Sequence, residues 1–249
     1  MSCAYHLAGA AAVIARRQLA TYEPTGPLLL RTCGPGGLSH GGFVWPLTPG
    51  SVVEAPDWDP TPGRCGGGLH GLLDGGGPGE RLDWSIAAVW MVVEALGPTA
   101  ETDDPGKVRC QRARVIVAGT REEATGYLVA RGCVGVHGAT STSGDRGTST
   151  SGDRGTSTSG YGGTSTSGYG GTSTSGDEGT STSGYRGTST SGYGGTSTSG
   201  YGGTLVLCWH DGTRYRLTVA YVGEDGIEPG VPYRADAQGR PVRADGGGA

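Results

Sequence analysis

Threonine is the residue whose type and spacing in this sequence could do chemistry. From Thr140 to Gly203 the octapeptide Thr-Ser-Thr-Ser-Gly-x-x-Gly is repeated eight times. In an extended strand, Thr at alternate positions places its hydroxyl and methyl groups on one side. A regular array of such groups could hold water molecules in an ordered layer.

The candidate water-binding residues fall into two rows, one from alternate repeats and the other from the repeats between them. The first row is Thr140, Thr142, Thr156, Thr158, Thr172, Thr174, Thr188 and Thr190. The second row is Thr148, Thr150, Thr164, Thr166, Thr180, Thr182, Thr196 and Thr198. The alternative interpretation is that Thr is present only because exposed strands favour β-branched side chains.

Each octapeptide predicts one short strand followed by one tight turn. Thr favours extended backbone, and Gly-x-x-Gly supplies the turn. A coil of two octapeptides, about 16 residues with strands on two facing sides, leaves a thin interior that Ser can fill, with rungs roughly 4.8 Å apart. We therefore expect Ser inside, Thr outside, and Ser hydroxyls bonded from coil to coil. A Gly- and Ser-rich flexible linker is the competing interpretation, but eight copies in perfect phase favour an ordered solenoid.

The variable positions of the repeat form columns in a 16-residue coil. One column contains Asp145, Tyr161, Asp177 and Tyr193, and the other contains Asp153, Tyr169, Tyr185 and Tyr201. Three consecutive Tyr residues, at 169, 185 and 201, predict a stacked ladder of rings. This ladder is a candidate surface for self-association into dimers or filaments.

The phrases Gly-Tyr-Gly-Gly-Thr-Ser-Thr-Ser and Gly-Asp-Glu-Gly-Thr-Ser-Thr-Ser resemble the central repeats of bacterial ice-nucleation proteins. Those repeats alternate Gly-Tyr-Gly and Gly-Glu-Asp turns with Thr-x-Thr strands. The resemblance covers the repeat, about a quarter of the chain. It implies 16-residue coils, outward Thr rows that bind ice or order water, and side-by-side association through tyrosines. This chain differs in having far fewer coils and Thr-Ser-Thr on both faces.

The flanking segments predict a mainly β protein with three parts. These are an α+β head (1–133), the solenoid (134–203) and a small antiparallel β cap (204–249). In the head we expect helices over Tyr5–Leu19 and from Thr120 to about Arg131, strands over Leu28–Cys33, Gly42–Leu47, Val52–Trp58, Ile86–Leu96 and Arg112–Ala118, and a Gly-rich loop over Gly66–Leu73. In the cap, Leu205 to Leu207 continue the repeat in register, and hairpins follow at Asp211-Gly212 and between Val231–Ala235 and Arg240–Arg243.

Catalytic and metal-binding patterns are weak in the head. His70, with Glu94 and Asp83 as partners, is the best candidate for catalysis, although a loop His more often satisfies local hydrogen bonds. Cys65, His70, Cys133 and His137 form a second candidate, for zinc, but their spacings are looser than the usual Cys-x2-Cys. We expect no catalytic residues, no metal and no cofactor.

Composition limits the possible partners and compartments. The chain has 249 residues, a net charge of −4 and scattered basic residues, which predicts no nucleic-acid partner. Six widely spaced Cys residues favour reduced thiols and a cytoplasmic location. The segment Ala4 to Ala15 lacks a basic leader, so we expect neither a signal peptide nor a membrane span. Surface display by another route stays open.

The order of head, repeat and cap also resembles a group of bacterial and phage proteins of uncharacterised function. The matching phrases lie at Cys65 to Gly71, Arg121 to Leu128 and Tyr221 to Pro229. This resemblance implies the architecture alone. The sequence therefore predicts a non-enzymatic solenoid that binds ice or water, with a self-assembling scaffold as the alternative and an enzyme in the head as a third hypothesis.

Overall fold

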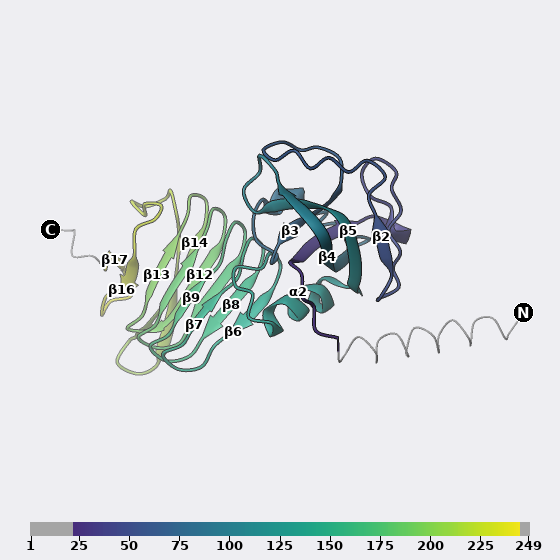
Figure 1. Ribbon diagram of the computed structural model, residues 1–249. Helices are drawn as coiled ribbons and strands as arrows, with labels where there is room; N and C mark the ends of the chain where they lie inside the picture. Colours follow the sequence, from purple (N-terminus) through teal and green to yellow (C-terminus); the bar gives the residue numbers. More distant parts are fainter. Residues whose placement is uncertain (1–21, 245–249) are drawn as a thin grey trace, which may run out of the picture. The chain divides into compact units, whose positions relative to one another are not determined.

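The computed structural model describes residues 22–244, which divide between two compact units, Met1–Cys133 and Val134–Ala249 (Figure 1). Each unit is described by itself below. The helix expected over Tyr5–Leu19 lies outside the described residues. The C-terminal strands belong to the same unit as the solenoid, and a separate cap domain over 204–249 stays a prediction.

The first unit is a small antiparallel barrel. Its sheet has the order β2 (Val52–Glu54), β5 (Lys107–Gly119), β3 (Leu69–Leu73), β1 (Leu28–Cys33) and β4 (Val89–Glu101). Strand β4 also pairs with β5, which closes the ring β5-β3-β1-β4. The remaining elements are the short 3-10 helices η1 (Pro35–Gly37) and η2 (Gly79–Arg81) and the helix α2 (Arg121–Ala130).

The barrel closes around an apolar interior to which both long strands, β4 and β5, contribute side chains. Residues Trp90 to Ala95 of β4 are all buried. One face of the sheet fills the barrel with side chains such as Leu29, Met91 and Val115, and α2 packs on β4 and β5 through the buried Leu128. Thr120 starts α2 with a capping box, since its side chain accepts from Glu123 N and Glu123 accepts from Thr120 N at 2.9 Å. The predicted helix start is confirmed.

Two sequence predictions in this unit are wrong. Gly42–Leu47 forms no strand and contributes only one isolated bridge, between Leu38 and Val44. Gly66–Leu73 was expected to be a loop, but Leu69–Leu73 is β3, and His70 lies on that strand. The glycines of this segment suggested a loop, but Gly71 has a different role. A Cβ at Gly71 would lie 2.7 Å from the Leu29 Cβ, so glycine is needed there because β3 packs closely on β1. The strands predicted over Leu28–Cys33 and Arg112–Ala118 are present, and β4 begins at Val89, after the exposed Ile86. Of the strand predicted over Val52–Trp58, only Val52–Glu54 is present, as β2.

The second unit is the predicted solenoid of about four coils, two octapeptides to a coil. One parallel sheet contains β6 (Thr140–Thr142), β8 (Thr156–Ser159), β10 (Thr172–Ser175) and β12 (Thr188–Tyr193). The facing sheet contains β7 (Thr148–Thr150), β9 (Thr164–Thr166), β11 (Thr180–Ser183) and β13 (Thr196–Ser199). Each strand pairs in register with the one 16 residues later, such as Thr156 with Thr172. The mainly β fold class is confirmed.

The C-terminal strands complete both sheets. Strand β14 (Thr204–His210) continues the first sheet in register, with Leu205 and Leu207 replacing the inward Ser of the repeat. Strand β15 (Tyr215–Tyr221) then pairs antiparallel with β14. On the second sheet, β16 (Tyr233–Ala235) pairs with β13, and β17 (Pro241–Arg243) pairs with β16. Both predicted hairpins are present, and they occupy the edge that would otherwise template further strands.

Each solenoid turn is a β-turn of the type II pattern. The amide of the last Gly donates to the carbonyl of the first, as in Gly171 N to Gly168 O at 3.2 Å. The second variable residue has a positive φ in every copy, between 52° at Arg154 and 70° at Gly194. Four copies place Gly there, and the other four place Arg or Glu, which carry the cost of the left-handed conformation.

We expect Gly170→Val to lower the free energy of unfolding by about 1–2 kcal/mol, because a β-branched residue disfavours the left-handed region. The measurement is a urea titration followed by circular dichroism. Gly170→Asn is the matched control, since Asn tolerates this conformation and should change little. Equal stability of the Val and Asn variants would contradict the strained-turn account.

Candidate functional site

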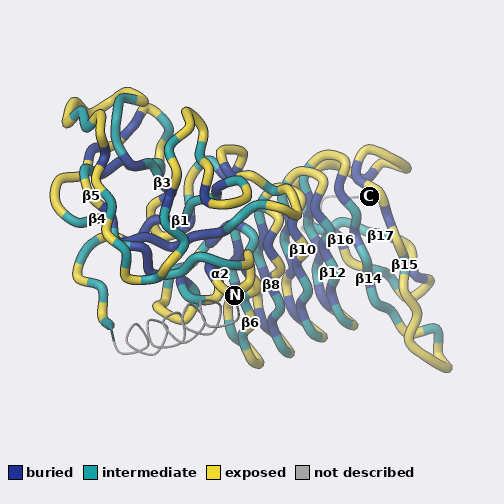
Figure 2. Tube along the Cα trace, turned by 90° about the vertical axis from the view of Figure 1, so that its right-hand side faces the viewer, coloured by how far each residue is buried: buried dark blue, intermediate teal, exposed yellow. Residues whose placement is uncertain are grey.

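The Thr rows lie on the outside of both sheets, as predicted. Both Thr residues of each strand are exposed or partly exposed, while the Ser between them is buried throughout the inner coils. Figure 2 shows this alternation along the solenoid strands, with exposed residues gathered at the turns. The sheets therefore present Thr pairs spaced by about 6.7 Å along a strand and about 4.8 Å between strands.

A hydrogen-bonded serine core holds the two sheets together. Ser157 Oγ lies 3.0 Å from Ser151 Oγ of the opposite sheet and 2.6 Å from the carbonyl oxygen of Thr166. The same pair of contacts recurs at Ser165 and Ser173. The Ser hydroxyls thus bond mainly across the core, and not from coil to coil as expected.

The Ser hydroxyls bond across the core because the interior is thin. Gly closes each turn because a Cβ at Gly171 would lie 2.7 Å from the Ser167 Cβ, so the two sheets approach closely. A hydroxyl then reaches the opposite sheet as easily as the next rung. A contact of the expected kind joins Ser183 and Ser199, one coil apart, at 2.9 Å.

Tyrosines form a stacked ladder on one side of the solenoid. The ring centroids of Tyr169 and Tyr185 are 5.6 Å apart and their planes differ by 10°. Those of Tyr185 and Tyr201 are 6.2 Å apart at 23°. The three side chains are 43 %, 42 % and 62 % exposed. The ladder geometry follows the prediction, and its use in association stays a prediction.

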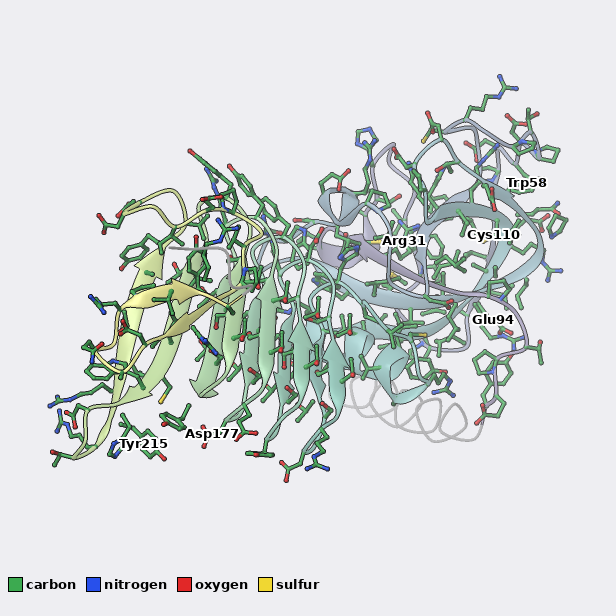
Figure 3. The ribbon with its side chains drawn as sticks, turned by 90° about the vertical axis from the view of Figure 1, so that its left-hand side faces the viewer. Arg31, Trp58, Glu94, Cys110, Asp177 and Tyr215 are labelled. Carbon is green, nitrogen blue, oxygen red and sulfur yellow. The ribbon has the colours of Figure 1, made fainter. Side chains whose placement is uncertain are left out.

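Where Asp occupies the first variable position of the repeat, its side chain forms a hydrogen bond to the turn of the next coil. The Oδ1 atom of Asp145 accepts from Tyr161 N one coil later at 3.0 Å, and Asp177 accepts from Tyr193 N at 2.8 Å (Figure 3 labels Asp177). Tyr161 also donates its hydroxyl to Glu178 at 2.6 Å, and this hydrogen bond raises the pKa of the Tyr161 phenol. Asp and Tyr therefore alternate in this column for a structural reason.

The head residues singled out in the sequence are not brought together. Glu94 is fully buried and accepts from Tyr22 Oη, Thr25 N and Gly26 N, so it anchors the N-terminal approach to β1. Asp83 caps its own turn by accepting from Ser85 N at 2.9 Å. Within residues 22–244, no hydrogen bond or ion pair joins His70 to either carboxylate. The proposed catalytic grouping is wrong.

The zinc hypothesis also fails in the part of the chain that the structure describes, where no three His, Cys, Asp or Glu side chains are arranged to hold a metal ion. His137 has a different role, because its Nδ1 accepts from Asp153 N at 2.8 Å and secures the first coil.

Cys65 and His70 are close, with 3.8 Å between Sγ and Nε2. Sequence reasoning missed their neighbour Lys107, which lies 42 residues from Cys65 and 37 from His70 and approaches through strand pairing.

Comparison with known proteins finds similarity over about two-fifths of the chain. Over 102 residues, 41 % of this chain, it is 36 % identical to a protein of Pseudomonas fluorescens. It is 36 % identical over 104 residues to a protein of Xanthomonas campestris pv. translucens and 33 % over 103 residues to InaU of Pantoea ananas. These relatives are ice nucleation proteins.

The similarity is local for the relatives as well. The matched part of this chain spans about 6 to 10 % of the length of these three ice nucleation proteins. No protein-family model matches the chain, and no solved structure does. Residues 22–244 contain no helix both long and apolar enough to cross a membrane. The comparisons lend no support to the cytoplasmic location expected from the sequence.

We expect Ser173→Val to destabilise the solenoid by about 1–3 kcal/mol, because two extra carbons must enter a fully packed interior and a cross-core hydrogen bond is lost. Thr172→Val, one residue earlier on the outer face, is the matched control and should stay within about 0.5 kcal/mol. Urea titration measures both. Similar losses for the two variants would contradict the assignment of inner and outer faces.

Proposed function

We propose that this protein binds ice, or orders ice-like water, on the outward Thr rows of its solenoid, and that it acts without catalysis. The observation that carries the proposal is the pair of in-register Thr lattices on one rigid scaffold. The local similarity to ice nucleation proteins supports it.

The scaffold suits this role because it fixes the Thr groups before water arrives. Every inner strand is hydrogen-bonded on both sides, and the serine core bonds the sheets to each other. Little conformational entropy is then lost when the surface takes up an ordered water layer. The Thr methyl groups restrict the positions that water can occupy, and the hydroxyls donate and accept hydrogen bonds.

The size of the array determines which activity to expect. Four rungs at the usual spacing extend over only about 19 Å. A template of this size orders few water molecules, so a single chain should adsorb to existing ice more effectively than it starts new crystals. Inhibition of ice recrystallisation is therefore the primary readout, and the freezing temperature of droplets is the second.

The decisive variant replaces part of one Thr row with Lys, at Thr156, Thr158, Thr172 and Thr174. Long charged side chains should disrupt the ordered layer and abolish the inhibition of recrystallisation. A second variant with Lys at Thr164, Thr166, Thr180 and Thr182 tests the opposite face. The matched control places four Lys on exposed loop positions outside the rows, at Thr61, Ile86, Ala237 and Gln238.

The outcomes separate the alternatives. Loss of inhibition in one row variant, with the control active, assigns the function to that face. A parent protein that leaves recrystallisation and freezing unchanged, while circular dichroism shows intact β structure, would overturn the proposal. Retained activity in a variant that carries both sets of Lys replacements would overturn the assignment to Thr.

A self-assembling scaffold is the second candidate function, and the half-exposed tyrosine ladder favours it. The stacked rings present a continuous aromatic strip that a second copy could cover. Aromatic pairs of this kind contribute about 0.5–1.5 kcal/mol each beyond their buried area.

We expect the replacement of Tyr169, Tyr185 and Tyr201 by Ser to shift the protein toward monomer, measured by sedimentation velocity over a range of concentrations. Replacement of Tyr161 and Tyr193, on the other column, is the control and should leave the association unchanged. An unchanged size distribution in the triple variant, or a parent that is monomeric at every concentration, would contradict association through this ladder.

A further inference from the structure

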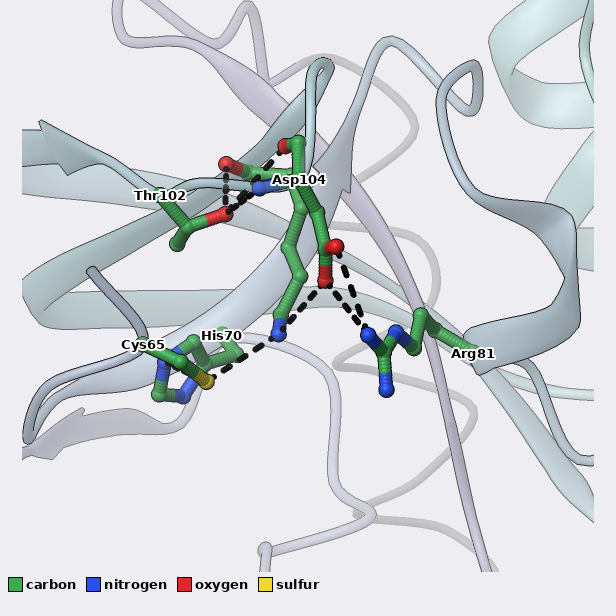
Figure 4. Close-up of polar contacts among 6 residues, drawn as sticks. Cys65, His70, Arg81, Thr102 and Asp104 are labelled. Carbon is green, nitrogen blue, oxygen red and sulfur yellow. Dashed lines mark hydrogen bonds and ion pairs between the residues drawn. The ribbon is translucent and has the colours of Figure 1, made fainter. Parts of the chain in front are cut away.

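The head contains a pocket of about 900 Å³ that the solenoid function does not use. Its lining includes Arg31 of β1, Trp45, Cys65 from the segment that precedes β3, His70 of β3, Arg81 and Lys107. Cationic side chains and a thiol therefore share the surface of one pocket. Figure 4 shows the cluster around Cys65, His70, Arg81 and Asp104.

The Cys65 thiol has both a cation and a base within reach. Its Sγ is exposed and lies 3.2 Å from Lys107 Nζ and 3.8 Å from His70 Nε2. A nearby ammonium group stabilises a thiolate, and a neutral imidazole can accept the thiol proton. Three residues from separate parts of the chain thus form the arrangement that activates a cysteine.

Surrounding charges hold this arrangement in place. Asp104 pairs with Lys107 at 3.4 Å and with Arg81 at 3.0 Å, so the ammonium group is positioned beside the sulfur. His70 is mostly shielded from solvent, and this burial, together with the positive charges of Lys107, Arg31 and Arg109, lowers its pKa. The imidazole is therefore neutral at physiological pH and free to act as a base.

Arg31 adds a further positive charge to the lining of the pocket. Its guanidinium lies 3.9 Å from the centre of the Trp45 ring and donates to His70 O at 2.8 Å. Together with Arg81 and Lys107, this charge favours a negatively charged molecule in the pocket.

We propose that Cys65 is a nucleophilic thiol that undergoes exchange with small, negatively charged disulfides bound in this pocket. His70 Nε2 takes the thiol proton, and the Cys65 sulfur attacks one sulfur of the disulfide. The bond between the two sulfurs of the disulfide breaks, and the released thiolate leaves with its electron pair and takes the proton from His70. The product is a mixed disulfide on Cys65 and one free small thiol, with no net oxidation.

The other described cysteines lack this environment. Cys33 and Cys110 are buried, and burial raises the pKa of Cys110 to about 12. Burial also raises the pKa values of Cys133 and Cys208. Cys65 should therefore react first.

The test uses the full chain with Cys3, Cys133 and Cys208 replaced by Ser, so that Cys65 is the accessible thiol. The probes are the dianionic disulfide dithiobis(nitrobenzoate), whose released thiol is coloured, and the neutral disulfide dithiodipyridine. We expect Cys65 in the folded chain to react at least about tenfold faster with the anionic probe than in the chain unfolded in urea, because the Lys107 ammonium beside the sulfur stabilises the thiolate. Added salt should slow the anionic probe only.

Variants assign the roles. Lys107→Met should lower the rate about tenfold, because the cation beside the sulfur is lost, and Lys107→Arg should restore much of the rate. His70→Asn should slow the reaction near neutral pH. Arg64→Met is the matched control, because it removes an exposed cation adjacent in sequence to Cys65 that pairs with Asp59 instead. Circular dichroism verifies that each variant is folded.

Equal rates for the folded and unfolded chains would overturn the proposal. So would a Lys107→Met rate that matches the Arg64→Met rate. The comparison of folded and unfolded parent needs no variant of the cluster, so the proposal can fail even if Lys107→Met does not fold.

Discussion

The thinness of the solenoid interior is the constraint on which the rest of that unit depends. Within the repeat, small Ser side chains fill the narrow space between the two sheets, and a Cβ at a turn-closing glycine such as Gly171 would lie 2.7 Å from the Ser167 Cβ. Ser contributes little apolar area, so cohesion comes from backbone ladders and hydroxyl bonds across the core, such as that from Ser165 to Ser159 at 2.9 Å. A hydrogen-bonded interior of this kind is directional, and it holds the outer surfaces in fixed register.

One 16-residue period then generates every feature of the outer surface. Strict pairing repeats Thr at two positions of each strand and brings the rings of Tyr169, Tyr185 and Tyr201 above one another. The same regularity creates an open strand edge. At the C-terminal side, the strand that contains Leu205 and Leu207 covers this edge and keeps the register of the repeat. Its two Leu side chains form an apolar core with Ile227 and Tyr233.

The head follows different physical principles. Its barrel has an apolar interior, and its buried charges fasten loops to the sheet. Arg109, which is fully buried on β5, donates to the carbonyl oxygens of Asp59, Thr61 and Gly67. Glu94 accepts from backbone amides in the segment that precedes β1. Loops held in this way border a pocket in which cations, an imidazole and a thiol lie close together. The head thus differs from the solenoid in having a pocket whose lining combines charged side chains with a thiol.

The sequence by itself determined the solenoid, its coil length, the outward Thr and the tyrosine column, because a repeat with fixed phase makes every contact local or one period away. It also determined the capping box at Thr120 and the apolar β4. Only the tertiary structure decided that His70 lies on a strand, that Glu94 is a structural anchor, and that Lys107 reaches Cys65. Those outcomes depend on pairing between strands distant in sequence, which leaves no periodic signal along a single chain.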